Sequence, residues 1–285
     1  MNTRYLFILL IALAQGVYAQ EQTFEVPATN SRSTVTQRLA ATDIEVAYNR
    51  PNVKGRVIFG DLVPYGKVWR TGSDASTKIT FSTSVWFNGL KVNSGTYELF
   101  TIPGKDEWTI ILQQNKSQWG SYSYNQENDV LRTTVKANAL HDMVETFTIG
   151  FGDIMSNSAI LALSWENVMV PVKITVDLKE TVLPQLEVSL QKEGKKPYFK
   201  AAMFYFENNL GIDRAAELMA MAIKENPDHI GMLYRQALIL ERKGDVNEAI
   251  AASEHSLEQA QKAPEELKTE YIKLNTVLLT RLRGR

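Results

Sequence analysis

The feature of this 285-residue sequence that most constrains its fold is a change of hydrophobic period near Asp177. Before that residue, apolar side chains mostly alternate with polar ones, which is typical of half-buried strands. After it, they recur at helical spacing. Examples are Ile44, Val46 and Tyr48 before the change, and Leu183, Leu186 and Leu190 after it. We therefore predict an all-β domain over residues 33–177, an antiparallel sandwich or jelly-roll-like barrel, and an all-α domain over residues 178–285.

Turn residues divide the β-domain into short strands. Asn88-Gly89 stands between the apolar runs Val85–Phe87 and Leu90–Val92, and this dipeptide suits the positive φ angles of a two-residue hairpin turn. A second turn, Ile102–Asp106, follows the predicted strand Thr96–Thr101. Because no long helical pattern interrupts this region, we expect neighbouring strands to pair in the antiparallel sense.

The helical domain contains an internal repeat. Ala215 and Ala249 lie 34 residues apart, and a turn signal precedes each of them, at Gly211–Asp213 and at Gly244-Asp245. A 34-residue period with small residues at helix crossings resembles the tetratricopeptide repeat, and we count about two degenerate copies. A terminal helix is expected over Glu265–Arg283, and its predicted buried face consists of Leu267, Tyr271, Leu274 and Leu278.

Stacked helical hairpins form a concave surface that commonly binds peptides or partner proteins. The candidate partner-binding residues on this surface are Tyr198, Phe199, Tyr205, Phe206, Tyr234 and Arg235. In a second interpretation, two repeats are too few for an independent groove, so the tail packs on itself or on the β-domain. The sequence leaves both interpretations open.

The N-terminus has the pattern of a secretory signal peptide. Met1–Ala19 contains a cation at Arg4, an apolar run at Tyr5–Ala14 and a small residue at its end. We expect cleavage before Gln20, followed by a leader over residues 20–32, and we expect the mature chain to be periplasmic or extracellular. The apolar run is too short to span a membrane, so no transmembrane segment is predicted in the mature chain.

Composition excludes several classes of function. The sequence holds 31 Lys and Arg against 32 Asp and Glu, so a net charge of -1 gives no general attraction to nucleic acid. It contains no cysteine, which excludes disulfides, thiolate nucleophiles, sulfur-ligated metals and a lipid-bearing cysteine. The three histidines, His141, His229 and His255, lack a second ligand at metal-binding spacing. No phosphate-binding, dinucleotide-binding or nucleophile-elbow motif is present. We predict no metal, cofactor or catalytic residue.

The loop Arg50–Gly72 is dense in glycine, proline and basic side chains. Its glycines and prolines indicate a specified backbone path rather than a slack connection. Arg50, Arg56 and Arg70 could converge on a carboxylate or phosphate, because a guanidinium group binds such groups in a bidentate manner. Alternatively, they bind loop carbonyls and neighbouring carboxylates. Trp69 is equally consistent with a core residue and with a binding surface.

A second candidate binding region is rich in aromatic residues. Trp119, Tyr122 and Tyr124 stand among polar Asn and Gln side chains, and flat aromatic rings in such surroundings suit sugars or peptides. In the other interpretation, the tryptophans pack between the sheets and the tyrosines cover an edge. Trp165 belongs to a late strand, and we expect it in the core.

Several motifs together resemble a family of secreted bacterial domains of unknown function, found mainly in envelope proteins of Bacteroidetes-type bacteria. These motifs are Arg50–Gly72 (RPNVKGRVIFGDLVPYGKVWRTG), Gly95–Trp108, Trp119-Gly120, Asp129–Arg132 and Leu163–Asn167. The resemblance covers about residues 30–175, and some members of the family carry a helical-repeat tail. It implies an exported all-β module, and it supplies no activity, ligand or catalytic residue.

Two classes of function remain. In the first, the protein is a non-catalytic envelope module whose β-domain binds a ligand and whose helices dock an envelope protein, peptide or glycan. In the second, it is a secreted hydrolase or isomerase with a site around Arg50, Arg56, Trp69 and Arg70. We favour the first, since absent motifs weaken the case for an enzyme.

Overall fold

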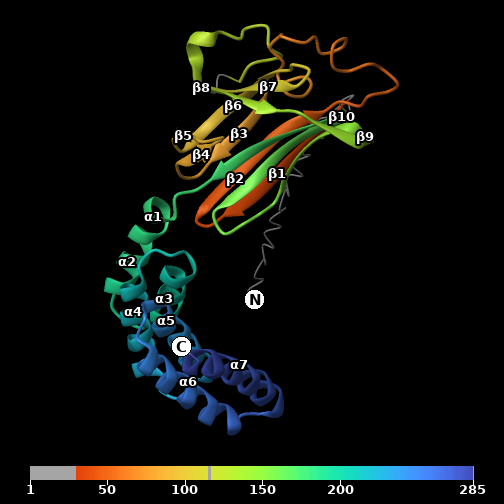
Figure 1. The fold of residues 1–285 in the computed structure, drawn as a ribbon. Helices are drawn as coiled ribbons and strands as arrows, with labels where there is room; N and C mark the ends of the chain where they lie inside the picture. The colour runs from red at the N-terminus through yellow and green to blue at the C-terminus, as the bar shows by residue number, and fades with distance from the viewer. Residues whose placement is uncertain (1–29, 115–116, 285) are drawn as a thin grey trace, which may run out of the picture.

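The computed structural model describes residues 30–114 and 117–284 (Figure 1). Two antiparallel β-sheets form the first part of the chain, and helices follow them as a curved array that extends away from the sheets. This confirms the predicted order of an antiparallel β-structure and a helical region. The predicted signal peptide lies outside the described residues.

The larger sheet has six strands in the order β1-β2-β3-β6-β7-β8. Its strands are β1 (Ser31–Leu39), β2 (Thr42–Arg50), β3 (Thr77–Phe81), β6 (Gly95–Ile102), β7 (Glu107–Gln114) and β8 (Asp129–Lys136). All neighbours pair in the antiparallel sense. The first strand begins two residues before the predicted start of the β-domain.

The smaller sheet has four strands in the order β5-β4-β10-β9. Its strands are β4 (Val85–Phe87), β5 (Leu90–Val92), β9 (Asn138–Gly152) and β10 (Ser158–Thr175). The β4–β5 turn has φ angles of 47° at Asn88 and 82° at Gly89, which confirms the predicted hairpin.

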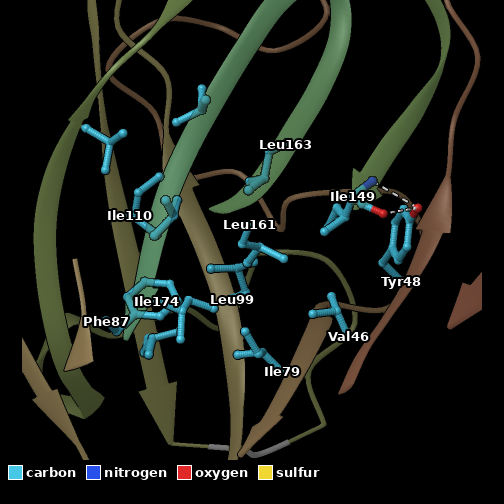
Figure 2. Packing of buried hydrophobic residues seen from close by; sticks show 14 of the residues in the cluster. Val46, Tyr48, Ile79, Phe87, Leu99, Ile110, Ile149, Leu161, Leu163 and Ile174 are labelled. Atoms are coloured by element: carbon cyan, nitrogen blue, oxygen red, sulfur yellow. Dashed lines mark hydrogen bonds between the residues drawn. The ribbon is translucent and has the colours of Figure 1, made fainter. Parts of the chain in front are cut away.

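The core lies between the two sheets (Figure 2). Val46, Ile79, Leu99 and Ile110 from the six-stranded sheet, with Phe87, Leu161, Leu163 and Ile174 from the four-stranded one, are all buried there. The Tyr48 hydroxyl bridges the sheets, because it donates to the Ile149 carbonyl at 3.1 Å and accepts from the Ile149 N–H at 2.9 Å. A buried phenol thus has both a donor and an acceptor partner.

Five aromatic rings close one region of this core: Phe59, Trp69, Trp108, Phe147 and Trp165. Trp69 and Trp165 stack at 5.7 Å between ring centres, while Phe59 meets Trp108 edge to face at 4.9 Å. Offset and edge-to-face geometries are the favoured ones for aromatic pairs. The expectation that Trp165 belongs to the core is confirmed.

Strands β6 and β7 are buried on both faces, although an alternating pattern predicts one exposed face. Leu99 and Ile110 face the core between the sheets, whereas Phe100 and Ile111 are buried on the outer face of the six-stranded sheet. The segment 117–125 covers part of that outer face, where the Tyr124 ring contacts Phe100 at 5.4 Å between ring centres. The extra burial therefore comes from the segment that follows β7 and folds back over the sheet.

Helices that follow one another in the chain pack together: α3 packs against α4, α5 against α6, and α6 against α7. They are α1 (Leu178–Thr181), α2 (Leu183–Gln191), α3 (Tyr198–Glu207), α4 (Ile212–Glu225), α5 (Ile230–Lys243), α6 (Val246–Gln261) and α7 (Glu265–Arg283). Ala215, Ala237 and Ala249 are fully buried at the helix contacts, as small residues at crossings must be.

The bounds predicted for the terminal helix match α7, but its predicted buried face is partly wrong. Leu267 is 45% exposed, whereas Asn275 is fully buried beside Leu278. The Asn275 amide donates to Ser256 Oγ at 2.9 Å, and its carbonyl accepts from Ser253 Oγ at 2.9 Å. Because these polar groups satisfy one another, a polar residue occupies a core position that hydrophobic periodicity assigns to leucine.

The first helices are joined to the β-domain by side-chain contacts. Asp177 caps α1 by accepting from the N–H groups of Lys179 and Glu180. Leu178 belongs to the core between the sheets, and Phe204 packs against that same core. The helical array therefore begins on a fixed base rather than on a free linker.

Candidate functional site

Two of the predicted loop arginines bind the backbone. Arg50 donates from Nε to the Phe147 carbonyl at 3.0 Å and from Nη2 to Thr148 Oγ1 at 2.8 Å. Arg56 donates from Nε to the Val53 carbonyl at 3.0 Å and from Nη2 to the Asn52 carbonyl at 2.6 Å. These bonds correspond to the structural interpretation of the loop, in which guanidinium groups hold carbonyls.

Trp69 and Arg70 lie on opposite faces of the six-stranded sheet. The backbone of Trp69 exchanges hydrogen bonds with Thr101, its ring is in the core, and its indole N–H donates to the Gly72 carbonyl at 3.0 Å. The next residue, Arg70, therefore projects to the outer face, beside Phe100. Its Nε is buried and has no hydrogen-bond partner. Since Trp69 and Arg70 diverge, the four residues of the hydrolase or isomerase hypothesis do not face one common site.

The outer face carries two highly exposed aromatic side chains on the segment 117–125, which we call the aromatic loop. Trp119 is 68% exposed and Tyr122 is 87% exposed. Gly120 between them has φ +70°, and a Cβ there would stand only 2.7 Å from the Tyr122 ring. The Tyr122 ring therefore lies beside a glycine, where any larger residue would collide with it, and most of its surface is open to solvent.

The backbone of the aromatic loop is tied to the segment 68–76. The Ser76 N–H donates to the Gln118 carbonyl at 3.1 Å, and the Gly120 N–H donates to the Asp74 carbonyl at 3.0 Å. Ser121 Oγ donates to the Val68 carbonyl at 3.2 Å. These bonds fall on both sides of Trp119, so the main chain that carries the exposed indole is held without using the indole itself.

Beneath the aromatic loop lies a buried polar cluster, formed by Ser76, Glu98, Gln113 and Gln118. Glu98 is fully buried, and its carboxylate accepts from Ser76 Oγ at 2.5 Å, the Gln118 N–H at 2.7 Å and Gln118 Nε2 at 2.9 Å. Gln118 Nε2 also donates to Gln113 Oε1 at 2.7 Å. A buried carboxylate is costly unless it is hydrogen-bonded, so this one fixes the start of the aromatic loop.

Sequence reasoning missed the polar cluster. A usable signal existed, because Glu98 and Gln113 stand next to the apolar runs Leu99-Phe100 and Ile110–Leu112 of β6 and β7. The ladder pairs these two residues directly across the strands. Buried polar residues at paired positions indicate a hydrogen-bonded network, but the pairing itself is known only from the fold.

Tyr124 is held in a second polar group with Asp129 and Arg132. Its hydroxyl contacts the Asp129 carboxylate at 2.8 Å and accepts from Arg132 Nη2 at 3.0 Å, while Arg132 Nε donates to Asp129 at 2.7 Å. Burial raises the pKa of Tyr124 above its usual value, and the hydrogen bond to Asp129 raises it further. Unlike Trp119 and Tyr122, this tyrosine fixes the far end of the aromatic loop.

The predicted partner-binding residues of the helical region differ in accessibility. Tyr205 is buried and donates to Glu187 at 2.8 Å. Tyr234 meets Tyr271 edge to face at 6.0 Å, and Arg235 lies 5.9 Å from the centre of the Phe199 ring. Tyr198 lines a groove at the start of α3. Of these residues, Tyr198 has the clearest access to a partner.

Within the described parts of the chain, no group of three or more His, Asp or Glu side chains is arranged to hold a metal ion. Over the same residues, no helix combines the length and the apolar character needed to cross a membrane.

A comparison with models of protein families matches residues 30–174 to a family described as "Protein of unknown function (DUF2911)". The match covers both sheets, the Arg50–Gly72 loop and the aromatic loop. No curated protein matches the chain. The bacterial group and the export that the sequence suggests stay predictions.

Proposed function

The chain belongs to the DUF2911 family, a family of unknown function, and we propose that it is a non-catalytic ligand-binding module of the bacterial envelope. In this proposal, the β-domain binds a glycan through Trp119 and Tyr122, and the helical region docks a protein partner. The single observation that carries the proposal is the exposure of two large aromatic rings on a loop that is fixed at both ends.

The aromatic loop supports binding because its two rings are exposed while its backbone is held by hydrogen bonds. Large aromatic rings are usually buried, and a ligand that covers two exposed rings on an ordered backbone does not have to order the loop as well. Flat rings suit the apolar faces of sugars, while the exposed side chain of Gln126 can bond hydroxyl groups.

Export is part of the proposal. It rests on the sequence of Met1–Ala19, and it predicts a mature protein that begins at Gln20. Mass spectrometry of protein recovered from the envelope or the medium tests this point. An intact Met1 on that protein would refute it.

The binding proposal is tested by a thermal-shift panel of peptidoglycan fragments and envelope glycans. At a hundredfold excess over Kd, a ligand stabilises the folded state by about 2.7 kcal/mol. We expect a stabilising glycan, and we expect its effect to be lost in the double variant Trp119→Ala/Tyr122→Ala. The matched control is Trp86→Ala, which removes a 40% exposed tryptophan from the other sheet.

Each outcome of this panel has a definite meaning. A glycan whose effect survives in the double variant would move the site away from the aromatic loop. A response to peptides alone would replace the glycan by a peptide as the ligand. Turnover of a bound glycan would favour the hydrolase hypothesis instead.

A further inference from the structure

A groove of about 450 Å³ opens where the start of α3 meets the end of α4 and the start of α5. Its apolar lining is half-buried or buried and comes from Tyr198, Phe199, Ala222 and Met232. The rings at the start of α3 thus form a recessed floor rather than a protruding edge. A recessed apolar floor fits an inserted side chain better than a flat surface.

The wall of this groove is basic. Lys195, Lys196 and Lys200 line it, against a single carboxylate at Glu225. Within the described residues, none of the three lysines forms a salt bridge or a side-chain hydrogen bond, and Lys195 and Lys200 are exposed. Behind the floor, the Arg235 guanidinium lies over the Phe199 ring. The local charge is therefore strongly positive in a chain whose total charge is -1.

From this arrangement we infer that the groove binds an acidic peptide segment of a partner protein. Carboxylates of the segment pair with Lys195, Lys196 and Lys200, while one aliphatic or aromatic side chain enters between Tyr198 and Met232. Glu225, which also lines the groove, accepts hydrogen bonds from the N–H groups of the bound segment. The inference rests on the proposed docking role of the helical region and names the class of partner.

The geometry favours a peptide over a membrane surface. Binding to an anionic bilayer requires apolar side chains that protrude into the lipid beside the basic ones. Here Tyr198, Phe199 and Met232 are half-buried, so none of them protrudes as an anchor that could enter the lipid beside the lysines. A single extended chain can occupy such a concave site.

The test is selection from a displayed library of random peptides, with the full mature protein as bait. We expect enrichment of sequences that combine Asp or Glu with a large apolar residue. Affinity for an enriched, synthesised peptide should fall about tenfold or more in Lys195→Glu/Lys200→Glu, since like charges then face the carboxylates. It should also weaken as salt is raised. The control Lys173→Glu/Lys273→Glu makes the same change of charge at exposed positions on β10 and α7, outside the groove, and should bind normally.

The outcomes separate this inference from the docking role. Enriched peptides without acidic residues, or peptides unaffected by the groove variant, would overturn the inference and leave docking in place. No enrichment at all would count against both. Binding to phosphatidylglycerol vesicles that is lost in the groove variant, with no peptide selected, would replace the acidic peptide by a membrane surface.

Discussion

The aromatic loop and the helical array use their large aromatic side chains in opposite ways. In the loop, backbone hydrogen bonds and the Glu98 carboxylate hold the main chain, so Trp119 and Tyr122 can stay exposed and are not needed to hold the loop in place. In the array, Tyr205 is buried against Glu187, and Tyr234 packs on Tyr271. Where the backbone is held by polar contacts, side chains are available for a ligand. In the array, where side chains hold the helices together, the tyrosines serve mainly to pack the helices.

The largest expected loss of stability comes from a substitution among the five aromatic rings of the core between the sheets. Trp165→Ala should lower the free energy of unfolding by about 3–5 kcal/mol, because it removes a ring that stacks on Trp69 and leaves a cavity. Calorimetric melting measures this loss. Trp86→Ala, at a partly exposed ring, should cost much less. Equal losses in the two variants would contradict the assigned core.

The helical array should be most sensitive where small residues allow close packing. Ala237→Leu should cost about 1–3 kcal/mol, since the fully buried alanine on α5 leaves no room for a larger side chain. Melting followed by far-ultraviolet circular dichroism reports on these helices. The control Thr276→Leu adds the same side chain at an exposed position of α7 and should be nearly neutral. A neutral Ala237→Leu would refute the close helix crossing.

The polar cluster should control the order of the aromatic loop. In Glu98→Gln, the amide oxygen can keep the bonds that Oε1 accepts from Ser76 Oγ and the Gln118 N–H, but the NH2 group at the Oε2 position then faces the donor Gln118 Nε2. We expect a loss of about 1–3 kcal/mol. Hydrogen exchange of the Gln118 and Gly120 amides should become faster than in the wild type. Glu107→Gln, at an exposed carboxylate, is the control. Unchanged exchange in Glu98→Gln would mean that the loop is held by other contacts.

The smallest effect is expected at the far end of the loop. Tyr124→Phe removes the hydroxyl that bonds Asp129 and Arg132, at a cost of about 1 kcal/mol near neutral pH. Since the pKa of Tyr124 is raised in the folded state, its stabilising contribution is complete below pH 10.0 and declines as pH rises through the raised pKa. The gap between wild type and variant should therefore narrow in alkaline urea titrations. A constant gap would contradict the assigned hydrogen bonds.

Local patterns in the sequence predicted the elements, and contacts between distant segments decided what the patterns missed. The Asn88-Gly89 hairpin and the bounds of α7 depend on neighbouring residues, so both were predictable. Phe100 is buried on the outer face because the aromatic loop, which follows β7, covers it. The alternation of residues within β6 cannot predict a contact with that loop. Asn275 was missed for the same reason, because its two serine partners lie on α6.

The candidate site was predicted in part. The sequence identified Trp119 and Tyr122 by their polar neighbours, and it grouped them with Tyr124, which the structure assigns to a polar support. It also proposed Arg50 and Arg56 as ligand contacts, but their donors are used by backbone carbonyls and a threonine hydroxyl. Side-chain type suggests what a residue can bind, whereas exposure and partners decide what it does bind.

The central claim is that Trp119 is exposed on an ordered loop that binds a glycan. The most direct test is fluorine NMR of the protein labelled with 5-fluorotryptophan at its five tryptophan positions. Trp119→Phe assigns one resonance. We predict that this resonance responds to deuterated solvent, as an exposed ring must, yet is as broad as those of the buried Trp69 and Trp165. It should then shift when a peptidoglycan fragment binds. A narrow, motionally averaged Trp119 line, or a bound fragment that leaves this line unmoved, would contradict an ordered aromatic binding loop.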